Sequence, residues 1–81
     1  MEQDEEARWR EAIAATLRAE RGIAGFSQAE MERRTGITRS SYRYYEQGVR
    51  LPDMVALAKI AEALGVPPSR IVAEIERRAS G

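Results

Sequence analysis

The side chains best suited to chemistry gather in the middle of the chain, between Ser27 and Gly48. Arginine can bind a guanine edge or a phosphate through two parallel hydrogen bonds, and hydroxyl and amide groups can bind the same partners. One side of a helix over residues 38–47 would present Arg39, Ser40, Arg43, Tyr44 and Gln47. This combination predicts a surface that contacts nucleic acid.

Two short helices are expected to position this surface. Ser27 is a suitable N-cap, and Glu30 can complete a capping box with it. The first helix is therefore predicted over residues 28–35. Gly36 supplies the left-handed residue that ends it.

A second helix is predicted almost at once, over about residues 38–47. Thr38 can cap it, and Gly48 gives it a glycine ending. Two helices joined by so tight a turn must cross at a steep angle, which is the helix-turn-helix geometry. Tyr42 and Tyr45 lie opposite the arginines, so we expect both to face the core.

The composition excludes several classes of protein. The 81 residues suffice for one domain with a modest core, and they are too few for an enzyme with a deep cleft. The chain has no cysteine and no histidine, so we expect no disulfide, no metal, no cofactor and no enzyme activity. The acidic start MEQDEEARWR is unlike a signal peptide, and no apolar run approaches a membrane span. We therefore expect a soluble intracellular protein.

The charges sum to zero, whereas a dedicated nucleic-acid-binding protein is usually basic. Their distribution is uneven, because residues 27–50 hold five basic and three acidic side chains while residues 1–26 hold four and six. The positive excess therefore coincides with the predicted helix-turn-helix. A neutral total still predicts weak affinity for arbitrary DNA, since few phosphates can be neutralised.

The chain before this motif predicts one more helix. Over about residues 7–21 an apolar side chain recurs every four residues, at Trp9, Ile13 and Leu17. Residues 1–6 are expected to form a flexible acidic lead. The two glycines of residues 22–25 are expected to break the helix and form a flexible link.

The chain after the motif predicts two more helices. Asp53 can cap the first of them, and Gly65 can end it. The buried stripe of this helix is expected at Met54, Leu57, Ile60, Ala61 and Leu64. Pro68 suits the first turn of the last helix, whose apolar side would be Ile71, Val72 and Ile75. We therefore expect an all-α domain of five helices over residues 7–78, followed by a flexible end at 79–81.

From about Ile13 to Ile71 the sequence resembles the phage repressor and Cro type of helix-turn-helix domain, also called the xenobiotic-response-element family. The matching residues are Leu17, Arg21, Ser27-Gln28, Gly36-Ile37, Tyr42, Tyr45-Glu46, Gly48, Pro52 and the run from Leu57 to Gly65. Together, with every spacing kept, they are a specific signal, whereas each alone is weak. The resemblance implies a lambda-repressor-like bundle that binds double-stranded DNA, usually as a homodimer, with the helix at 38–47 in the major groove.

The resemblance also implies where the DNA contacts lie. Gln28 would contact a phosphate and brace the recognition helix, while Thr38 and Ser41 would lie near the DNA backbone. The side chains facing base edges would be Arg39, Ser40 and Arg43 or Tyr44, with Gln47 on the same side. An ordinary solvated face is the alternative for these arginines, and an exposed ring without a contact is the alternative for Tyr44.

A structural ion pair is implied between Arg21 and Glu46, which would tie the first helix to the recognition helix. Two positions depart from the family pattern, and at one of them Thr35 replaces a usual leucine. Glu32 stands where a small residue is usual, at the crossing of the two helices. Its carboxylate must point outward or find a partner such as Arg39 or Arg43.

Two functions from different classes follow. The first is a sequence-specific transcriptional regulator, a repressor, in the cytoplasm of a bacterium or of a phage host. The alternative is a protein-interaction module with the same fold that has lost DNA binding, for which the neutral charge, the acidic N-terminus and Glu32 argue. A dimer is expected if Val72 and Ile75 exceed what one domain can cover. Otherwise, Trp9 and the first helix cover them within the monomer.

Overall fold

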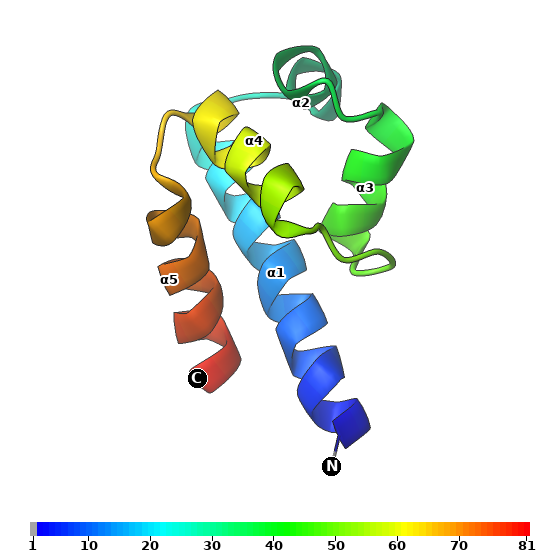
Figure 1. Ribbon diagram of the computed structural model, residues 1–81, viewed down its shortest axis with the longest axis vertical. Coiled ribbons are helices and arrows are strands. Elements are labelled where there is room, and N and C mark those ends of the chain that lie inside the picture. The colour runs from blue at the N-terminus through cyan, green and yellow to red at the C-terminus, as the bar shows by residue number, and fades with distance from the viewer. Residues whose placement is uncertain (1) are drawn as a thin grey trace.

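The computed structural model describes residues 2–81, with side chains from residue 4 onward, and within that range the chain is all-α (Figure 1). Its helices are α1 (Glu2–Ala24), α2 (Gln28–Thr35), α3 (Arg39–Gln47), α4 (Met54–Leu64) and α5 (Pro68–Ser80). The predicted five-helix bundle with a helix-turn-helix is confirmed. None of the helices in the described range combines the length and hydrophobicity that a membrane span requires.

Each of the three central helices starts at a side-chain cap and ends at a left-handed glycine. The caps are Ser27, Thr38 and Asp53, each of which accepts a hydrogen bond from the backbone amide three residues later. The glycines are Gly36, Gly48 and Gly65, with φ between 74° and 77°. These local signals explain why the predicted bounds of α2 and α3 agree with the structure.

The first helix begins earlier than predicted. It starts at Glu2, so most of the expected flexible lead at residues 1–6 is helical. The carboxylate of Glu6 and the guanidinium of Arg10 form an exposed ion pair at 2.8 Å, one helical turn apart, which supports this part of the helix. Met1 lies outside the described residues.

Two other predicted flexible stretches are also shorter in the structure. Gly22 lies inside α1, and only Gly25, with φ of 76°, ends the helix. A glycine inside a helix costs about 1 kcal/mol, which the packed turns before it can offset. At the other end of the chain, α5 continues to Ser80 and Ala79 is buried, so most of residues 79–81 is helical.

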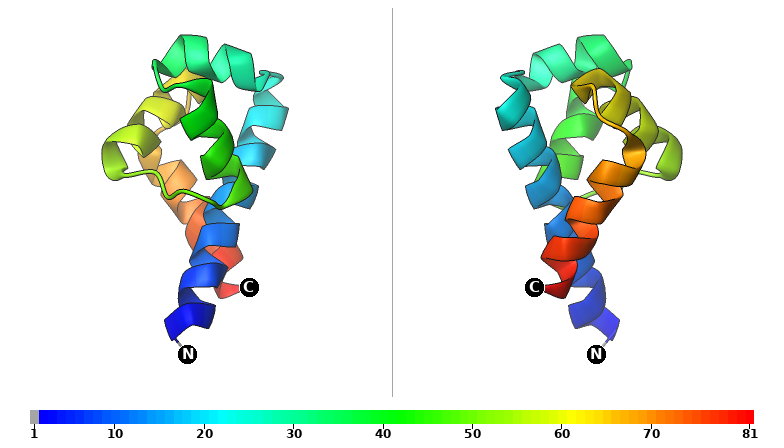
Figure 2. Two further views of the ribbon diagram at one scale, coloured as in Figure 1. Left: turned by 90° about the vertical axis from the view of Figure 1, so that its right-hand side faces the viewer. Right: turned by 90° about the vertical axis from the view of Figure 1, so that its left-hand side faces the viewer.

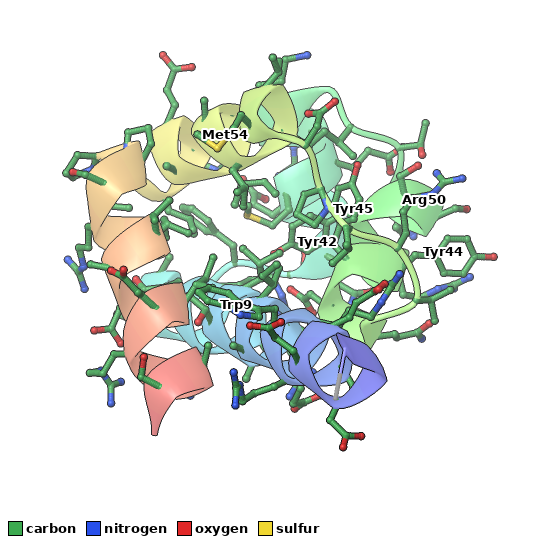
Figure 3. All side chains as sticks on the ribbon, turned by 60° about the horizontal axis from the view of Figure 1, so that its bottom comes forward. Trp9, Tyr42, Tyr44, Tyr45, Arg50 and Met54 are labelled. Carbon is green, nitrogen blue, oxygen red and sulfur yellow. The ribbon has the colours of Figure 1, made fainter. Side chains whose placement is uncertain are left out.

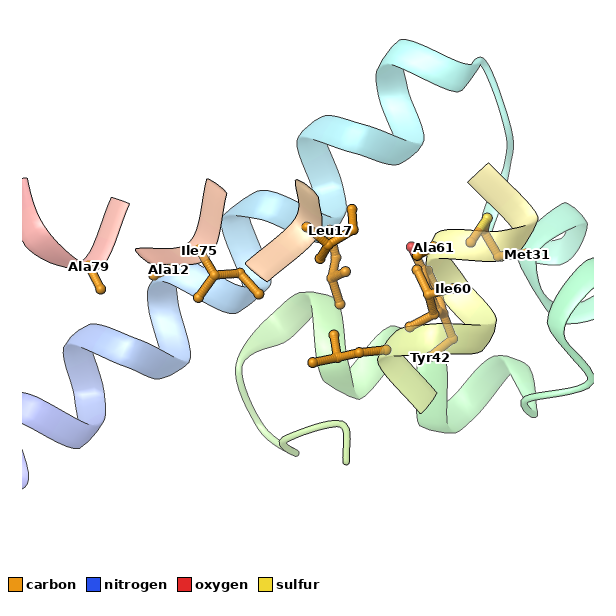
Figure 4. Close-up of a cluster of buried hydrophobic side chains, with 10 residues drawn as sticks. Ala12, Leu17, Met31, Tyr42, Ile60, Ala61, Ile75 and Ala79 are labelled. Carbon is orange, nitrogen blue, oxygen red and sulfur yellow. The ribbon is translucent and has the colours of Figure 1, made fainter. Parts of the chain in front are cut away.

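The helices enclose one core (Figure 4). α1 and α5 lie side by side, and α4 packs against both while α2 and α3 close the remaining side (Figures 1 and 2). The largest side chains with no exposed surface come from every helix and are Tyr42, Leu17, Met31, Ile60 and Ile71. This core fixes α3 with one face turned inward and the other turned to solvent.

Some predicted core positions differ. Met54 is 62% exposed, because it lies in the first turn of α4, outside the stripe that faces the core. Ile75 is only 3% exposed, so the monomer covers it, whereas Val72 remains exposed. Trp9 is 37% exposed and thus covers the edge of the core only in part.

Candidate nucleic-acid interface

One face of α3 turns all its predicted base-contacting side chains to solvent. The exposed residues are Arg39, Ser40, Arg43, Tyr44 and Gln47. The intervening Tyr42 and Glu46 are buried and Tyr45 is half-buried, as the helical period requires. In Figure 3 the ring of Tyr44 points away from the body of the molecule, while Tyr42 and Tyr45 lie on its inner side. The predicted division of α3 into an inner and an outer face is confirmed.

Beneath this face, Glu46 is held by a two-pronged ion pair. Arg21 donates from Nε to Glu46 Oε2 at 2.6 Å and from Nη2 to Glu46 Oε1 at 3.0 Å. Burial alone would raise the pKa of Glu46, but Arg21, Tyr42 and Gln28 stabilise the charged carboxylate, outweigh the burial and lower the pKa below its ordinary value. The carboxylate therefore stays charged, and the pair ties α1 to α3 as the resemblance implied.

Gln28 takes part in the same cluster. Its Nε2 donates to Glu46 Oε1 at 3.1 Å, which links the first residue of α2 to the inner side of α3. The bracing role expected of Gln28 is confirmed. Its contact with a phosphate stays a prediction.

Sequence analysis missed two further arginines that anchor α3. Arg18 donates from Nη1 to the backbone carbonyl of Glu46 at 2.6 Å. Arg10 makes longer hydrogen bonds, at 3.5 Å, to the carbonyls of Gly48 and Val49. The last carbonyls of a helix lack intrahelical partners and carry its negative dipole end, so cations stabilise them. Nothing in the sequence pattern distinguishes these arginines from solvated ones, because their partners are backbone atoms distant in the chain.

The two arginines of the outer face have different partners. Arg39 donates from Nε to Glu32 Oε1 at 3.3 Å, which is one of the two arrangements predicted for Glu32. The guanidinium of Arg43 lies over the ring of Tyr44, with its carbon 5.8 Å from the ring centroid. Both arginines are exposed.

The hydroxyl groups at the start of α3 already have structural partners. Thr38 Oγ1 accepts from the amide of Ser41 at 3.2 Å as the N-cap. Ser41 is half-buried, and its hydroxyl accepts from Nη1 of Arg50 at 3.2 Å. Their proximity to a DNA backbone stays a prediction.

Arg50 is a candidate contact that sequence analysis missed. It follows α3 in the connection to α4, is exposed and bonds to Ser41, so its charge lies beside the outer face. Arg50 and Tyr44 lie together at one edge of the molecule in Figure 3. The available signal was a basic residue in the extended segment before Pro52, but only the fold shows that this segment passes beside α3.

Comparison with known proteins decides the family. Residues 12–73 match the pattern of a family described as a helix-turn-helix domain. The chain belongs to this family. The matched part of this helix-turn-helix protein contains the whole of α2, α3 and α4, and therefore the entire face described above.

Curated relatives of this helix-turn-helix chain are regulators by name. It is 41% identical over 54 residues to the cryptic phage CTXphi transcriptional repressor RstR of Vibrio cholerae. The aligned segment covers 67% of this chain and 48% of the repressor. It is 34% identical over 59 residues to an uncharacterized HTH-type transcriptional regulator of Mycobacterium tuberculosis. That aligned segment covers 73% of this chain and 23% of the regulator. The chain thus spans less than half the length of these relatives. No solved structure matches it.

Proposed function

We propose that the chain is the sequence-specific DNA-binding domain of a transcriptional regulator, a repressor, acting in the cytoplasm of a bacterium or of a phage host. The observation that carries the proposal is the solvent-facing stripe of α3 with Arg39 and Arg43, held rigid from beneath by Arg21 and Glu46. Family membership and the name of the phage repressor relative support the same function. Such a domain acts by binding, and we expect no catalysis.

The geometry suits insertion of α3 into the major groove. An α-helix such as α3 is about 10 to 12 Å across with its side chains, and a major groove about 12 Å wide admits it. Base edges would be contacted by Arg39, Ser40, Arg43, Tyr44 and Gln47. Phosphates would be contacted by Gln28, Thr38, Ser41 and Arg50.

The whole chain has no net charge, but residues 27–50 hold five basic and three acidic side chains, so a positive excess remains around α3 even though each of these acidic groups has a basic partner. Glu46 is bound by Arg21, Glu30 is bound by Arg33 and Arg34 on its own helix, and Glu32 is bound by Arg39. The acidic first turns of α1 project beyond the bundle, at the far end from α2 (Figure 1). These arrangements favour a DNA-binding face over the alternative of a protein-interaction module.

A titration of a duplex with the purified protein at increasing salt tests the proposal. The face carries three exposed arginines, Arg39, Arg43 and Arg50, and if each displaces a counterion, log K should fall with log[salt] with a slope of about −3 per chain. Arg39→Ala/Arg43→Ala should weaken binding and make the slope shallower, while Arg8→Ala, an exposed arginine of α1, should not. A folded protein that binds no duplex at low salt would support the protein-interaction module instead.

Binding as a twofold dimer is part of the proposal, and we propose that its interface lies on α4 and not on α5. Ile75 of α5 is covered, whereas the outer side of α4 exposes Met54 and Val55 by 62% and 63%. Next to Val55 lies an open hollow of about 530 Å³, which Ala58, Val66 and Pro68 help to line. Solvent-exposed apolar surface of this kind is typical of an interface.

We propose a second copy of the chain as the occupant of this hollow, because its charges can complement themselves. Lys59 and Glu62 line it together, and neither forms an ion pair within the part of the chain that the structure describes. In a twofold interface the same surface meets itself, so Lys59 of each copy would face Glu62 of the other.

A further inference from the structure

The ion pair between Glu32 and Arg39 joins the two helices of the helix-turn-helix across their turn. Of the acidic side chains in residues 27–50, Glu46 is buried and Glu30 binds arginines of α2. Glu32 is therefore the one whose carboxylate reaches the outer face of α3. Its partner is the first residue of that helix.

The pair engages only the inner edge of the guanidinium. Arg39 donates from Nε to Glu32, and its Nη1 and Nη2 bind none of the residues that the structure describes. The Arg39 side chain is 59% exposed. The two Nη groups form the fork that binds O6 and N7 of a guanine through parallel hydrogen bonds. Glu32 thus holds one edge of the group and leaves the edge that recognises guanine free.

We propose that Glu32 is a positioning residue for DNA specificity, which orients Arg39 so that its free Nη groups meet a guanine. This inference rests on the proposed function. A free arginine side chain has many rotamers and loses them on binding, and a partner at Nε restricts them beforehand. A guanidinium whose orientation is restricted in this way favours the base whose acceptors match its two Nη groups.

The same carboxylate lowers affinity for DNA in general. It cancels the charge of Arg39 and adds a negative group near the phosphates, which weakens contacts that any sequence can make. Specificity is a difference between affinities, so weaker general binding and a better oriented fork act in the same direction. Arg43 has an aromatic neighbour in place of a carboxylate and keeps its full charge for the DNA.

The test compares Glu32→Ala with Glu30→Ala, which also removes an ion-paired carboxylate from α2. Dissociation constants are measured for the duplex that wild type selects and for duplexes in which the guanine assigned to Arg39 is replaced. That guanine is the position at which Arg39→Ala loses its preference. Glu32→Ala should bind all duplexes about two- to fivefold more tightly, yet prefer guanine about fivefold less. Glu30→Ala should raise affinity without changing the preference.

Two further variants separate positioning from general electrostatics. In an Arg39→Ala background, Glu32→Ala should leave the remaining base preferences unchanged. Glu32→Gln keeps an acceptor for Nε without the charge, so its preference should lie between wild type and Glu32→Ala. Circular dichroism and thermal melting check that every variant is folded.

An undiminished preference for guanine in Glu32→Ala would overturn the inference while leaving the proposed function intact. The inference would also be overturned if Glu30→Ala lost as much of the preference for guanine as Glu32→Ala, or if Arg39→Ala left all base preferences unchanged. A folded wild-type protein that binds no duplex would overturn both.

Discussion

At the residue scale, the least replaceable group beneath α3 is the carboxylate of Glu46. It is 3% exposed, and both its oxygens accept hydrogen bonds from Arg21, with a third from Gln28. A buried charge is unfavourable unless it is paired. Removing one partner therefore costs more stability than the loss of a single hydrogen bond, because the carboxylate stays buried without it.

Arg21→Ala should therefore destabilise the whole domain. It leaves a buried carboxylate with only Gln28, and breaking such a pair costs about 3 kcal/mol of the free energy of unfolding. For a domain of this size the melting temperature should fall by about 12 °C or more. The matched control is Arg8→Ala, because Arg8 is an exposed arginine of the same helix. Equal melting temperatures for Arg21→Ala and wild type would contradict the structural role of the pair.

The same cluster predicts an acid dependence of stability. The pKa of Glu46 is lower in the folded chain than in the unfolded one, so its contribution is present above its ordinary pKa and is lost as the pH falls through the folded pKa. In urea unfolding, wild type should therefore have a higher free energy of unfolding than Glu46→Gln at pH 7. This difference should become smaller below roughly pH 4. A gap of constant size from pH 7 to pH 3 would show that Glu46 does not titrate as described.

At the element scale, the turns between helices depend on backbone conformation more than on packing. Gly36 ends α2 with φ of 77°, and a Cβ there would meet nothing within 4 Å. Gly22 lies inside α1 with equally open surroundings but helical backbone. The two glycines therefore differ in conformation and share the same lack of steric hindrance.

Substituting alanine at these positions should have opposite effects. Gly36→Ala should lower the free energy of unfolding by about 1 kcal/mol, because an L side chain is strained in the left-handed region. Gly22→Ala should raise it by about 0.5 to 1 kcal/mol, since alanine favours a helix interior. Chemical denaturation measures both values, and a stabilised Gly36→Ala would mean that α2 does not end as described.

These elements also show what the sequence could predict. Caps and ending glycines are local signals, so the bounds of α2 and α3 and the two faces of α3 follow from neighbouring residues. The sequence misplaced the start of α1, where helix and disordered lead have similar composition. It also assigned Met54 to the core, because the periodicity of α4 does not distinguish its first turn from the turns that face α1.

Long-range contacts account for the remaining differences in the candidate site. Arg10 and Arg18 bind carbonyls near the end of α3, and Arg50 returns beside Ser41, all through partners that no sequence spacing indicates. The pair between Arg21 and Glu46 was predictable only through the family resemblance. The outer face could therefore be predicted from residue types alone. The contacts that hold α3 in place could be identified only from the folded structure.

At the scale of the whole molecule, the proposed complex would have one α3 on each half-site, so a twofold dimer would place two such helices about 34 Å apart, one turn of DNA. Sedimentation velocity of wild type should show a dimer. Val55→Glu should shift it to monomer, because the substitution buries a charge in the apolar interface. Ile23→Glu is the control, since Ile23 is also exposed but lies at the end of α1.

Charge reversal tests the orientation of this interface. Lys59→Glu alone should weaken the dimer by a few-fold, because two carboxylates then face each other. Adding Glu62→Lys should restore it. A wild-type monomer, or a Val55→Glu variant that sediments like wild type, would exclude the α4 interface.

The measurement that tests the central claim most directly is selection of bound duplexes from a random library by the wild-type protein at moderate salt. Arg39→Ala/Arg43→Ala serves as the comparison, since both side chains are exposed and their loss should leave the fold intact. If α3 recognises bases in the major groove, wild type will enrich an inverted repeat whose guanines lose their preference in the variant. Enrichment of the same sequence by both proteins, or of none by folded wild type, would contradict recognition of DNA by α3.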